Sequence, residues 1–319
     1  MALAILCSGG DAPGMNAAIK KFVDVVYDKG ETPFFIYDGL EGMIDNKIVR
    51  AEYTDVAGIL HRGGTIIRSS RSKRFYEYAY RKQAYDNLKK QNITDLVVLG
   101  GDGSFRAMNV LCSEFDLKFV GIPVTIDNDI YGTEYCIGVD TAQNVIRDAL
   151  DKIRDTASAF KRAFVVETMG RECGYLAAIS ALTSGAEVCV IPEVAFNQKV
   201  AEEKLKEEVA NGRNYILAIV AEGTGQTEHI ARWLEESIGM ETRKTILGHI
   251  QRGGNPTVMD RFMAFEFVIQ AIEYLLSHDK AKVAIGYRED AFHFLPIDEV
   301  TSHTYKIRQE ILDGLRYLD

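Results

Sequence analysis

Short apolar runs alternate along most of the chain with stretches in which apolar residues recur three and four positions apart. The apolar runs predict buried strands, and the longer spacing predicts helices. The expected strands are 2–8, 32–37, 96–99, 119–123, 163–167, 188–191, 215–220 and 245–247. The expected helices are 15–28, 76–91, 141–156, 200–211, 228–237 and 258–277, with a short strand and a terminal helix after Tyr287.

Alternation of strands and helices is typical of α/β proteins whose mainly parallel sheets are flanked by helices. With 319 residues, the chain exceeds the size at which one hydrophobic core usually stops growing, so two domains are expected. No Pro- or Ser-rich linker separates them, and a boundary near Asp140 is only weakly marked.

Composition narrows the classes of function. Hydrophobic residues make up 47% and charged residues 26%, which is typical of a globular protein, and the net charge of −9 argues against general nucleic-acid binding. The five cysteines are scattered without a Cys-x-x-Cys pair and are expected to be small buried residues in a reducing compartment. No apolar run reaches membrane-spanning length and no signal-peptide pattern opens the chain, so we expect a cytoplasmic protein without membrane contact.

Two acidic clusters follow predicted strands directly: Gly100–Ser104 after 96–99, and Thr125–Asp129 after 119–123. Ligands of open α/β sheets bind at the carboxyl ends of strands. Either cluster could be a simple turn, but the pair favours metal-assisted phosphoryl transfer. Asp102 is suited to hold Mg²⁺, and the carboxylates of Asp127 and Asp129 beside a hydroxyl are suited to moving a proton.

The segment 7–16 places three glycines and a proline between a strand and a helix. Its backbone N–H groups and the helix N-terminus could face an anion, although a tight turn alone would explain the glycines about equally well. The segment is neither a Walker loop nor a Gly-x-Gly-x-x-Gly dinucleotide fingerprint.

Basic residues gather beside glycine turns, where arginine can bind phosphate with two hydrogen bonds. A lone arginine is more often a surface ion-pair partner, and a lone histidine more often a core residue. The groups are Arg62–Arg74, Lys161–Arg162, Met169–Arg171 and Arg243–Gly254, the last of which contains His249 and Arg252.

Taken together, the segments 8–16, 100–104, 123–129, 167–171 and 248–254 resemble those of bacterial ATP-dependent 6-phosphofructokinases, in order and spacing, from residue 3 to about 285. The resemblance implies transfer of the ATP γ-phosphoryl group to the 1-hydroxyl of fructose 6-phosphate with Mg²⁺. It also implies two similar three-layer α/β domains with the active site in the cleft between them, and a homotetramer. The nucleotide domain would be 1–138 plus 251–300, and the sugar-phosphate domain 139–250 plus 301–319.

The resemblance also implies residue roles. Asp127 matches the general base, flanked by Thr125 and Asp129, and Asp102 matches the magnesium ligand. Arg71 and Arg171 match groups that stabilise the transferred phosphoryl group. The matched ATP positions are Gly10, Arg71, Ser72, Gly101, Asp102, Gly103 and Ser104. The matched sugar-phosphate positions are Thr125, Asp127, Arg162, Met169, Gly170, Arg171, Glu222, Arg243, His249 and Arg252, with Arg162 and Arg243 contributed by a neighbouring subunit.

The phosphoryl donor follows from two neighbouring residues. Pyrophosphate-using relatives place a carboxylate after Gly-Gly-Asp and a lysine before Thr-Ile-Asp. This chain has Gly103 and Val124 at these positions. Gly103 leaves room for the α-phosphate of a nucleotide, and Val124 provides no cation to bind a bare pyrophosphate. Val124 and Leu40 depart from the residues usual in ATP users, and we interpret both as tuning nucleotide affinity.

Three alternatives remain. A pyrophosphate-dependent phosphofructokinase is opposed by Gly103 and Val124. A lipid or NAD kinase shares Gly-Gly-Asp-Gly but lacks the segments 169–171 and 248–254. A non-enzymatic sugar-phosphate or nucleotide sensor is opposed by the presence of both Asp102 and Asp127.

Regulation is expected to differ from that of the family, whose members bind ADP or phosphoenolpyruvate at a basic effector site. Arg154, Glu187, Arg213 and the cation of Lys20 match that site. The positions of Asp24, Tyr53, Asn211 and Tyr215 are usually basic, and a carboxylate such as Asp24 repels an anionic effector. This pattern predicts effector control that is weak, lost or retuned.

Saturation curves for fructose 6-phosphate, measured with and without ADP or phosphoenolpyruvate, test this expectation. We expect the curves to shift little, because the site has lost cations that would bind an anion. Strong inhibition by millimolar phosphoenolpyruvate that ADP relieves would show that the effector site is intact.

Overall fold

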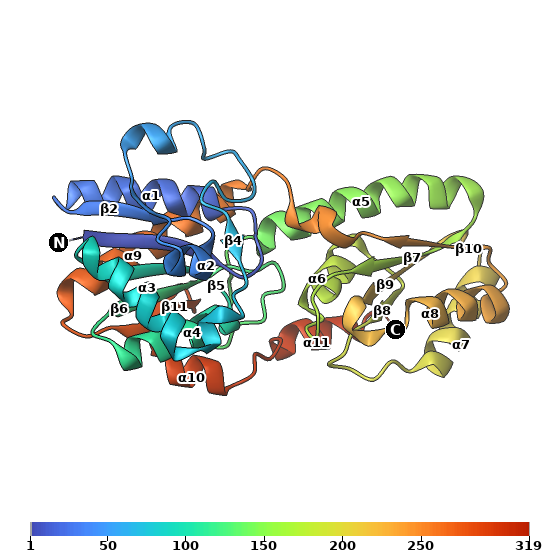
Figure 1. The fold of residues 1–319 in the computed structure, drawn as a ribbon. Helices are drawn as coiled ribbons and strands as arrows, with labels where there is room; N and C mark the ends of the chain where they lie inside the picture. The colour runs from blue at the N-terminus through green and yellow to red at the C-terminus, as the bar shows by residue number, and fades with distance from the viewer. Residues whose placement is uncertain (1, 319) are drawn as a thin grey trace. The chain divides into compact units, whose positions relative to one another are not determined.

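The computed structural model describes residues 2–318, which form two compact units (Figure 1). Unit 1 contains the chain up to Thr125, Ile130–Thr141 and Arg252–Tyr305. Unit 2 contains Ile126–Asp129, Ala142–Gln251 and the chain from Lys306 onward. The chain therefore crosses between units at 141/142, 251/252 and 305/306, and briefly at 126–129, whereas the sequence suggested crossings at 138/139, 250/251 and 300/301.

The elements have the following bounds. The strands are β1 (Ala2–Ser8), β2 (Thr32–Ile36), β3 (Ile48–Arg50), β4 (Ser69–Ser70), β5 (Ile93–Gly100), β6 (Lys118–Pro123), β7 (Ala163–Thr168), β8 (Val188–Val190), β9 (Ile216–Ala221), β10 (Thr242–Ile246), β11 (Lys282–Arg288) and β12 (Ala291–Pro296). The helices are α1 (Met15–Asp28), α2 (Gly39–Ile44), α3 (Tyr78–Lys90), α4 (Asp102–Glu114), α5 (Val139–Phe160), α6 (Tyr175–Ser184), α7 (Gln198–Ala210), α8 (Thr227–Trp233), α9 (Val258–Ser277), α10 (Ile297–Ser302) and α11 (Gln309–Leu315).

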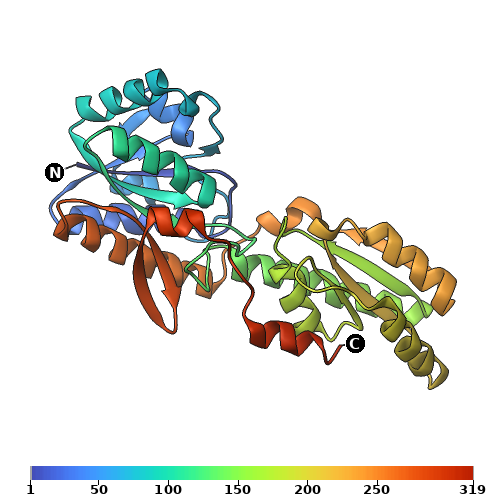
Figure 2. The same cartoon turned by 90° about the horizontal axis from the view of Figure 1, so that it is seen from below.

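Unit 1 is built on a sheet of order β12-β11-β6-β5-β1-β2-β3, with β4 pairing to β1. The pairs β2–β3 and β11–β12 are antiparallel, and the other pairs are parallel. Helices α1 and α9 pack together on one face, and α3, α4 and α10 lie on the other (Figures 1 and 2). Because helices cover both faces, β1 is buried along its whole length and reads as a continuous apolar run.

Unit 2 contains a parallel sheet of order β10-β7-β9-β8. One face forms a core with α7 and α8, in which Val165 and Ala218 pack against Leu205 and Ile230. Helix α6 covers the other face (Figure 1). The mixed α/β fold with mainly parallel sheets confirms the predicted fold class.

Several elements differ from their prediction. Helices α2, α4, α6 and α10 and strands β3, β4 and β11 were not expected. Helix α4 follows two glycines that indicated a turn, and α6 carries apolar residues on every side, so it lacks an amphipathic period. Strand β10 begins at Thr242 and not at Thr245, because it is an edge strand that tolerates the charges of Arg243 and Lys244.

The expected helix 228–237 changes character partway along. Helix α8 ends at Trp233, and Leu234–Ile238 continues as a π-helical turn. Among residues 2–318, no helix combines the length and apolarity needed to span a bilayer.

Candidate active site

The carboxylate of Asp127 is almost completely buried at the start of unit 2. It follows β6 and Thr125, and its side chain is 1% exposed. The Arg171 guanidinium approaches it, with Nε 3.3 Å from Oδ2. Asn128, which follows the carboxylate, has a positive φ of 52°, an uncommon conformation outside glycine. A buried carboxylate beside a half-exposed cation can accept a proton from a bound hydroxyl.

Arg171 lies in a strained turn at the carboxyl end of β7. Its φ is +53°, and the preceding Gly170 has a φ of +139°. The Arg171 backbone N–H donates to Glu222 Oε1 at 3.0 Å, and Glu222 follows the neighbouring strand β9. Left-handed backbone at a non-glycine residue persists only where the surroundings hold it. Glu222 therefore fixes the turn that presents the Arg171 guanidinium to Asp127.

Gln251 joins two predicted ligand segments, although the sequence did not single it out. It is fully buried, its Oε1 accepts from the Met169 N–H at 3.1 Å, and its Nε2 donates to the Gly248 carbonyl at 2.9 Å. The end of β7 is thereby tied to the turn that carries the exposed His249. Met169, Gly170, Arg171, Glu222, Asp127 and the turn of His249 all belong to unit 2.

Arg162 and Arg243 lie near the amino-terminal ends of the strands of the same sheet, away from the Met169–Arg171 turn. Arg162 precedes β7, and Arg243 pairs with Phe164 near the beginning of that strand. Glu241 contacts both guanidinium groups: its Oε2 lies 2.6 Å from Arg162 Nε, and its Oε1 pairs with Arg243 Nη2. These contacts lower the pKa of Glu241, the Arg162 hydrogen bond most of all. At about 3.3 Å per residue, β7 separates this pair from the Met169–Arg171 turn by roughly 20 Å.

In unit 1, the ends of β1 and β5 bring the two glycine segments together. Ser104, in the first turn of α4, donates to the Ser8 carbonyl at 3.0 Å and contacts the Ser8 hydroxyl at 2.9 Å. Strand β4 pairs with the end of β1, so Arg71 and Ser72 follow at the same edge as Gly10. The structure thus gathers the predicted ATP positions at the carboxyl edge of this sheet.

Arg252, at the end of the 3-10 helix Gly248–Arg252 that also contains His249, approaches this glycine loop. Its Nη1 is 4.0 Å from Asp11 Oδ1, and a Cβ on Gly10 would lie 2.3 Å from Nη1. Gly10 is therefore needed for the close approach of the guanidinium. Arg252 belongs to unit 1, whereas His249 belongs to unit 2.

Asp102 opens α4 at the same edge, with a side chain that is 44% exposed. Its carboxylate accepts from Arg106 Nε at 2.8 Å. No cluster of three or more His, Cys, Asp or Glu side chains able to hold a metal occurs within residues 2–318. Mg²⁺ is usually held by one or two carboxylates together with substrate phosphates and water, so a single exposed carboxylate beside glycine turns fits it.

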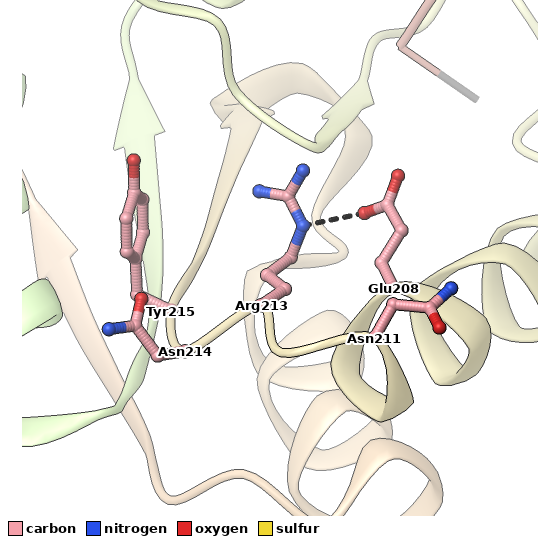
Figure 3. Close-up of a pocket in the computed structure, with 5 residues that line it drawn as sticks. All are labelled: Glu208, Asn211, Arg213, Asn214 and Tyr215. Carbon is pink, nitrogen blue, oxygen red and sulfur yellow. Dashed lines mark ion pairs between the residues drawn. The ribbon is translucent and has the colours of Figure 1, made fainter.

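The positions that match the family's effector site are largely paired within the chain. A hollow of about 310 Å³ is lined by Glu208, Asn211, Arg213, Asn214 and Tyr215 (Figure 3). The Arg213 guanidinium contacts Glu208, with Nε 2.6 Å from Oε2, and also contacts Glu187. Burial raises the pKa of Glu187, although the Leu217 N–H and Arg213 act against this.

Two further effector positions are also engaged. Lys20 Nζ lies 3.1 Å from Asp24, one helical turn along α1, and the Arg154 guanidinium donates to the Ser184 carbonyl. The cations at Lys20 and Arg213 therefore already have carboxylate partners.

The Phosphofructokinase family model matches residues 2–275, so the chain belongs to the phosphofructokinase family. It is 57% identical to an "ATP-dependent 6-phosphofructokinase" of a Sulfurovum species, over 97% of this chain and 95% of the relative. It is 55% identical to a protein of the same name from Sulfurimonas denitrificans, over 98% of each chain.

Solved structures of phosphofructokinases have the same fold as this chain. The phosphofructokinase of Saccharomyces cerevisiae superposes with a TM-score of 0.91 at 33% identity, covering 94% of this chain and 45% of that one. A pyrophosphate-dependent phosphofructokinase from Marinobacter aquaeolei has a TM-score of 0.85 at 18% identity, covering 99% of this chain and 91% of that one, which shows the shared fold alone.

Replacing Gln251 tests whether it joins the two segments. Gln251→Leu leaves the Met169 N–H and the Gly248 carbonyl without their buried partner, so we expect a loss of about 1–3 kcal/mol in unfolding free energy. We also expect weaker binding of fructose 6-phosphate. Chemical denaturation and equilibrium titration measure the two effects.

The matched control is Gln309→Leu, at an exposed glutamine of α11 in the same unit. Surface substitutions of this kind usually change stability by no more than about 0.5 kcal/mol. If Gln251→Leu proves as stable and binds as tightly as the control, Gln251 does not hold the segments together.

Proposed function

We infer that the protein is an ATP-dependent 6-phosphofructokinase. The observation that carries this inference is the buried Asp127 carboxylate with Arg171 Nε 3.3 Å away, in a chain 57% identical to a protein of that name. The product pair is fructose 1,6-bisphosphate and ADP. In this role the protein acts in glycolysis, in the cytoplasm.

The Asp127 carboxylate takes the proton of the sugar 1-hydroxyl as its oxygen attacks the γ-phosphorus. The bond between the γ-phosphorus and the β–γ bridging oxygen breaks, and ADP leaves with that electron pair. Thr125 and Asp129 flank the base. Arg171, half exposed beside Asp127, and Arg71 offset the negative charge on the transferred group.

Unit 1 holds the nucleotide in this proposal. The backbone of Gly10 and Gly101, the side chains of Ser72 and Arg71, and Ser104 are assigned to the phosphates because they lie at one sheet edge. The buried Ser104 hydroxyl contacts Ser8 and joins the two glycine segments. Asp102 would hold Mg²⁺, which would offset the negative charge of the phosphates. Arg106 now engages the Asp102 carboxylate and keeps it oriented at the start of α4.

The sugar phosphate is held by unit 2, where the chain brings Met169, Gly170, Arg171, Glu222 and the His249 turn together. The backbone at 169–171 and the Glu222 carboxylate are suited to sugar hydroxyls. His249 and Arg252 are assigned to the 6-phosphate, as the family resemblance implies. Because the Arg252 guanidinium lies beside the loop of Gly10 and Asp11, we assign it a second contact, with the nucleotide-binding loop.

ATP is favoured over pyrophosphate by the surroundings of Gly103 and Val124. A Cβ on Gly103 would meet no atom within 4 Å, so a carboxylate would fit sterically and its absence leaves the space open. Val124 is 2% exposed and contributes no cation. The pyrophosphate-dependent neighbour shares only 18% identity.

Sharing of sites between subunits is supported by the location of Arg162 and Arg243. Both lie roughly 20 Å along β7 from the Met169–Arg171 turn of their own chain, so they are better placed to serve another copy. Large apolar side chains are exposed on α9, with Val258 83% and Phe262 57% exposed. These features support a homotetramer in which each sugar site takes two arginines from a neighbour.

The effector site is weakened in this proposal, because Glu187 and Glu208 engage Arg213 and Asp24 engages Lys20. An anionic effector would have to displace these carboxylates. The Lys20–Asp24 pair is partly exposed and therefore modest in energy, whereas the Glu187 side chain that pairs with Arg213 is only 8% exposed.

A panel of phosphoryl donors and acceptors tests the function. ATP and pyrophosphate are each supplied with Mg²⁺ and with fructose 6-phosphate, tagatose 6-phosphate or sedoheptulose 7-phosphate, and products are followed by phosphorus NMR. We expect fructose 1,6-bisphosphate and ADP from the first pairing, with at least about 100-fold less turnover from pyrophosphate, equivalent to about 2.7 kcal/mol.

Turnover with pyrophosphate that equals or exceeds turnover with ATP would overturn the donor assignment. Binding of both substrates without turnover in any pairing would support the sensor alternative.

A further inference from the structure

The carboxylate of Asp260, in the first turn of α9, is fully buried and accepts four hydrogen bonds. One oxygen accepts from the Tyr135 hydroxyl at 2.6 Å and from the Gly138 N–H at 2.7 Å. The other accepts from the Thr141 N–H at 2.8 Å and from the Thr141 hydroxyl. All four donors lie in the segment Tyr135–Thr141, more than a hundred residues away in the sequence.

These contacts cap a helix from a different element. Gly138 and Thr141 supply N–H groups at the start of α5, where such groups have no partner within the helix. Burial raises the pKa of Asp260, and the hydrogen bonds from Thr141, Tyr135 and Gly138 act against this. Removing the carboxylate would leave buried N–H groups unsatisfied.

Thr257 also connects the start of α9 to the start of α5. Thr257, which precedes α9, donates its hydroxyl to Asp140, and its own N–H donates to the Thr141 hydroxyl at 3.0 Å. The start of α9 and the start of α5 are thus bound to each other by both side chains, Thr257 and Asp260.

The segment held by Asp260 supports the end of β6. The Ile137 N–H donates to the Pro123 carbonyl at 3.0 Å, and Ile137 forms a parallel bridge with Val124. Thr125 is the next residue, and the chain continues directly to Asp127. Together with the pairing of β6 to β5, Ile137 therefore helps to position the strand end from which the base-bearing segment continues.

The same segment also supports the glycine loop at the end of β1. A Cβ on Gly138 would lie 2.6 Å from the Ala12 Cβ, and a Cβ on Gly14 would lie 2.5 Å from Ile137 Cγ2. The backbone at Gly138 therefore packs closely against Ala12, and the Ile137 side chain packs closely against Gly14. A shift of Tyr135–Thr141 is therefore passed to the loop, because packed interiors transmit strain.

We propose that Asp260 is a positioning residue for phosphoryl transfer. Asp260 holds the segment Tyr135–Thr141, and this segment in turn fixes the position of the glycine loop 9–14, on the nucleotide side, relative to the strand end that leads to Thr125 and Asp127. This inference rests on the proposed function. Because the Asp260 carboxylate is fully buried, it acts through these two segments and not on a substrate.

Asp260→Asn tests the proposal, because an amide keeps the size but presents two hydrogens to donors. Tyr135→Phe is the milder variant, since it removes one donor and leaves the carboxylate and both backbone N–H bonds. The control is Asp95→Asn in β5, a fully buried carboxylate of the same unit that pairs with Lys118 at 2.6 Å and contacts neither segment. Steady-state kinetics are measured well below each unfolding midpoint, together with hydrogen exchange.

For Asp260→Asn we expect kcat to fall about 10-fold to 100-fold, more than either KM rises, because displacement of reacting groups by about 1 Å has costs of this order. Tyr135→Phe should change kcat in the same direction by a smaller factor. Backbone N–H groups at 9–12, 14, 124 and 125 should exchange faster in Asp260→Asn, while Asp95→Asn changes neither kcat nor exchange there.

The proposal is overturned if folded Asp260→Asn keeps its kcat, or if Asp95→Asn loses as much. If Asp260→Asn does not fold, an unchanged kcat and unchanged exchange in Tyr135→Phe overturn it. Wild-type protein without kinase activity would refute the proposed function, and the exchange comparison would then decide the positioning role by itself.

Discussion

A buried carboxylate needs a cation or hydrogen-bond donors, and this requirement organises the candidate site around Asp127. Arg171 meets part of it from a turn in which its own backbone is left-handed. That turn is held in place by Glu222, and the adjoining Met169 N–H by Gln251. The contacts of Glu222 and Gln251 thus hold the Arg171 guanidinium beside the Asp127 carboxylate, which can take a proton.

The proposed chemistry divides between the units according to strand direction. Parallel strands bring their carboxyl ends to one edge, so the glycine segments of unit 1 gather there, as do Arg171 and Glu222 in unit 2. Asp102 then serves the nucleotide and Asp127 the sugar. Arg162 and Arg243 lie near the amino-terminal ends of these strands, and in the proposed homotetramer they serve a neighbouring subunit.

Much of the fold was predictable because its main signals are local. Strand β1 and helices α1 and α9 have the predicted bounds, since each carries its apolar pattern within itself. Helix α6 was not predicted because apolar residues occur on all its sides, so its sequence lacks the amphipathic period of a surface helix. The motif residues were visible as strand-end clusters, whereas Gln251 and Asp260 were not. Their roles depend on partners far along the chain, such as Met169 and Thr141, that no local pattern reveals.

The most direct test of this account compares Asp127→Ser with Asp151→Ser, which changes an exposed aspartate on α5. Binding of ATP and fructose 6-phosphate is measured by titration, and turnover by coupled assay. The account predicts that Asp127→Ser binds both ligands and loses at least about 100-fold in kcat, the contribution typical of a general base. The control should match wild type. Near-normal turnover by Asp127→Ser would contradict the account.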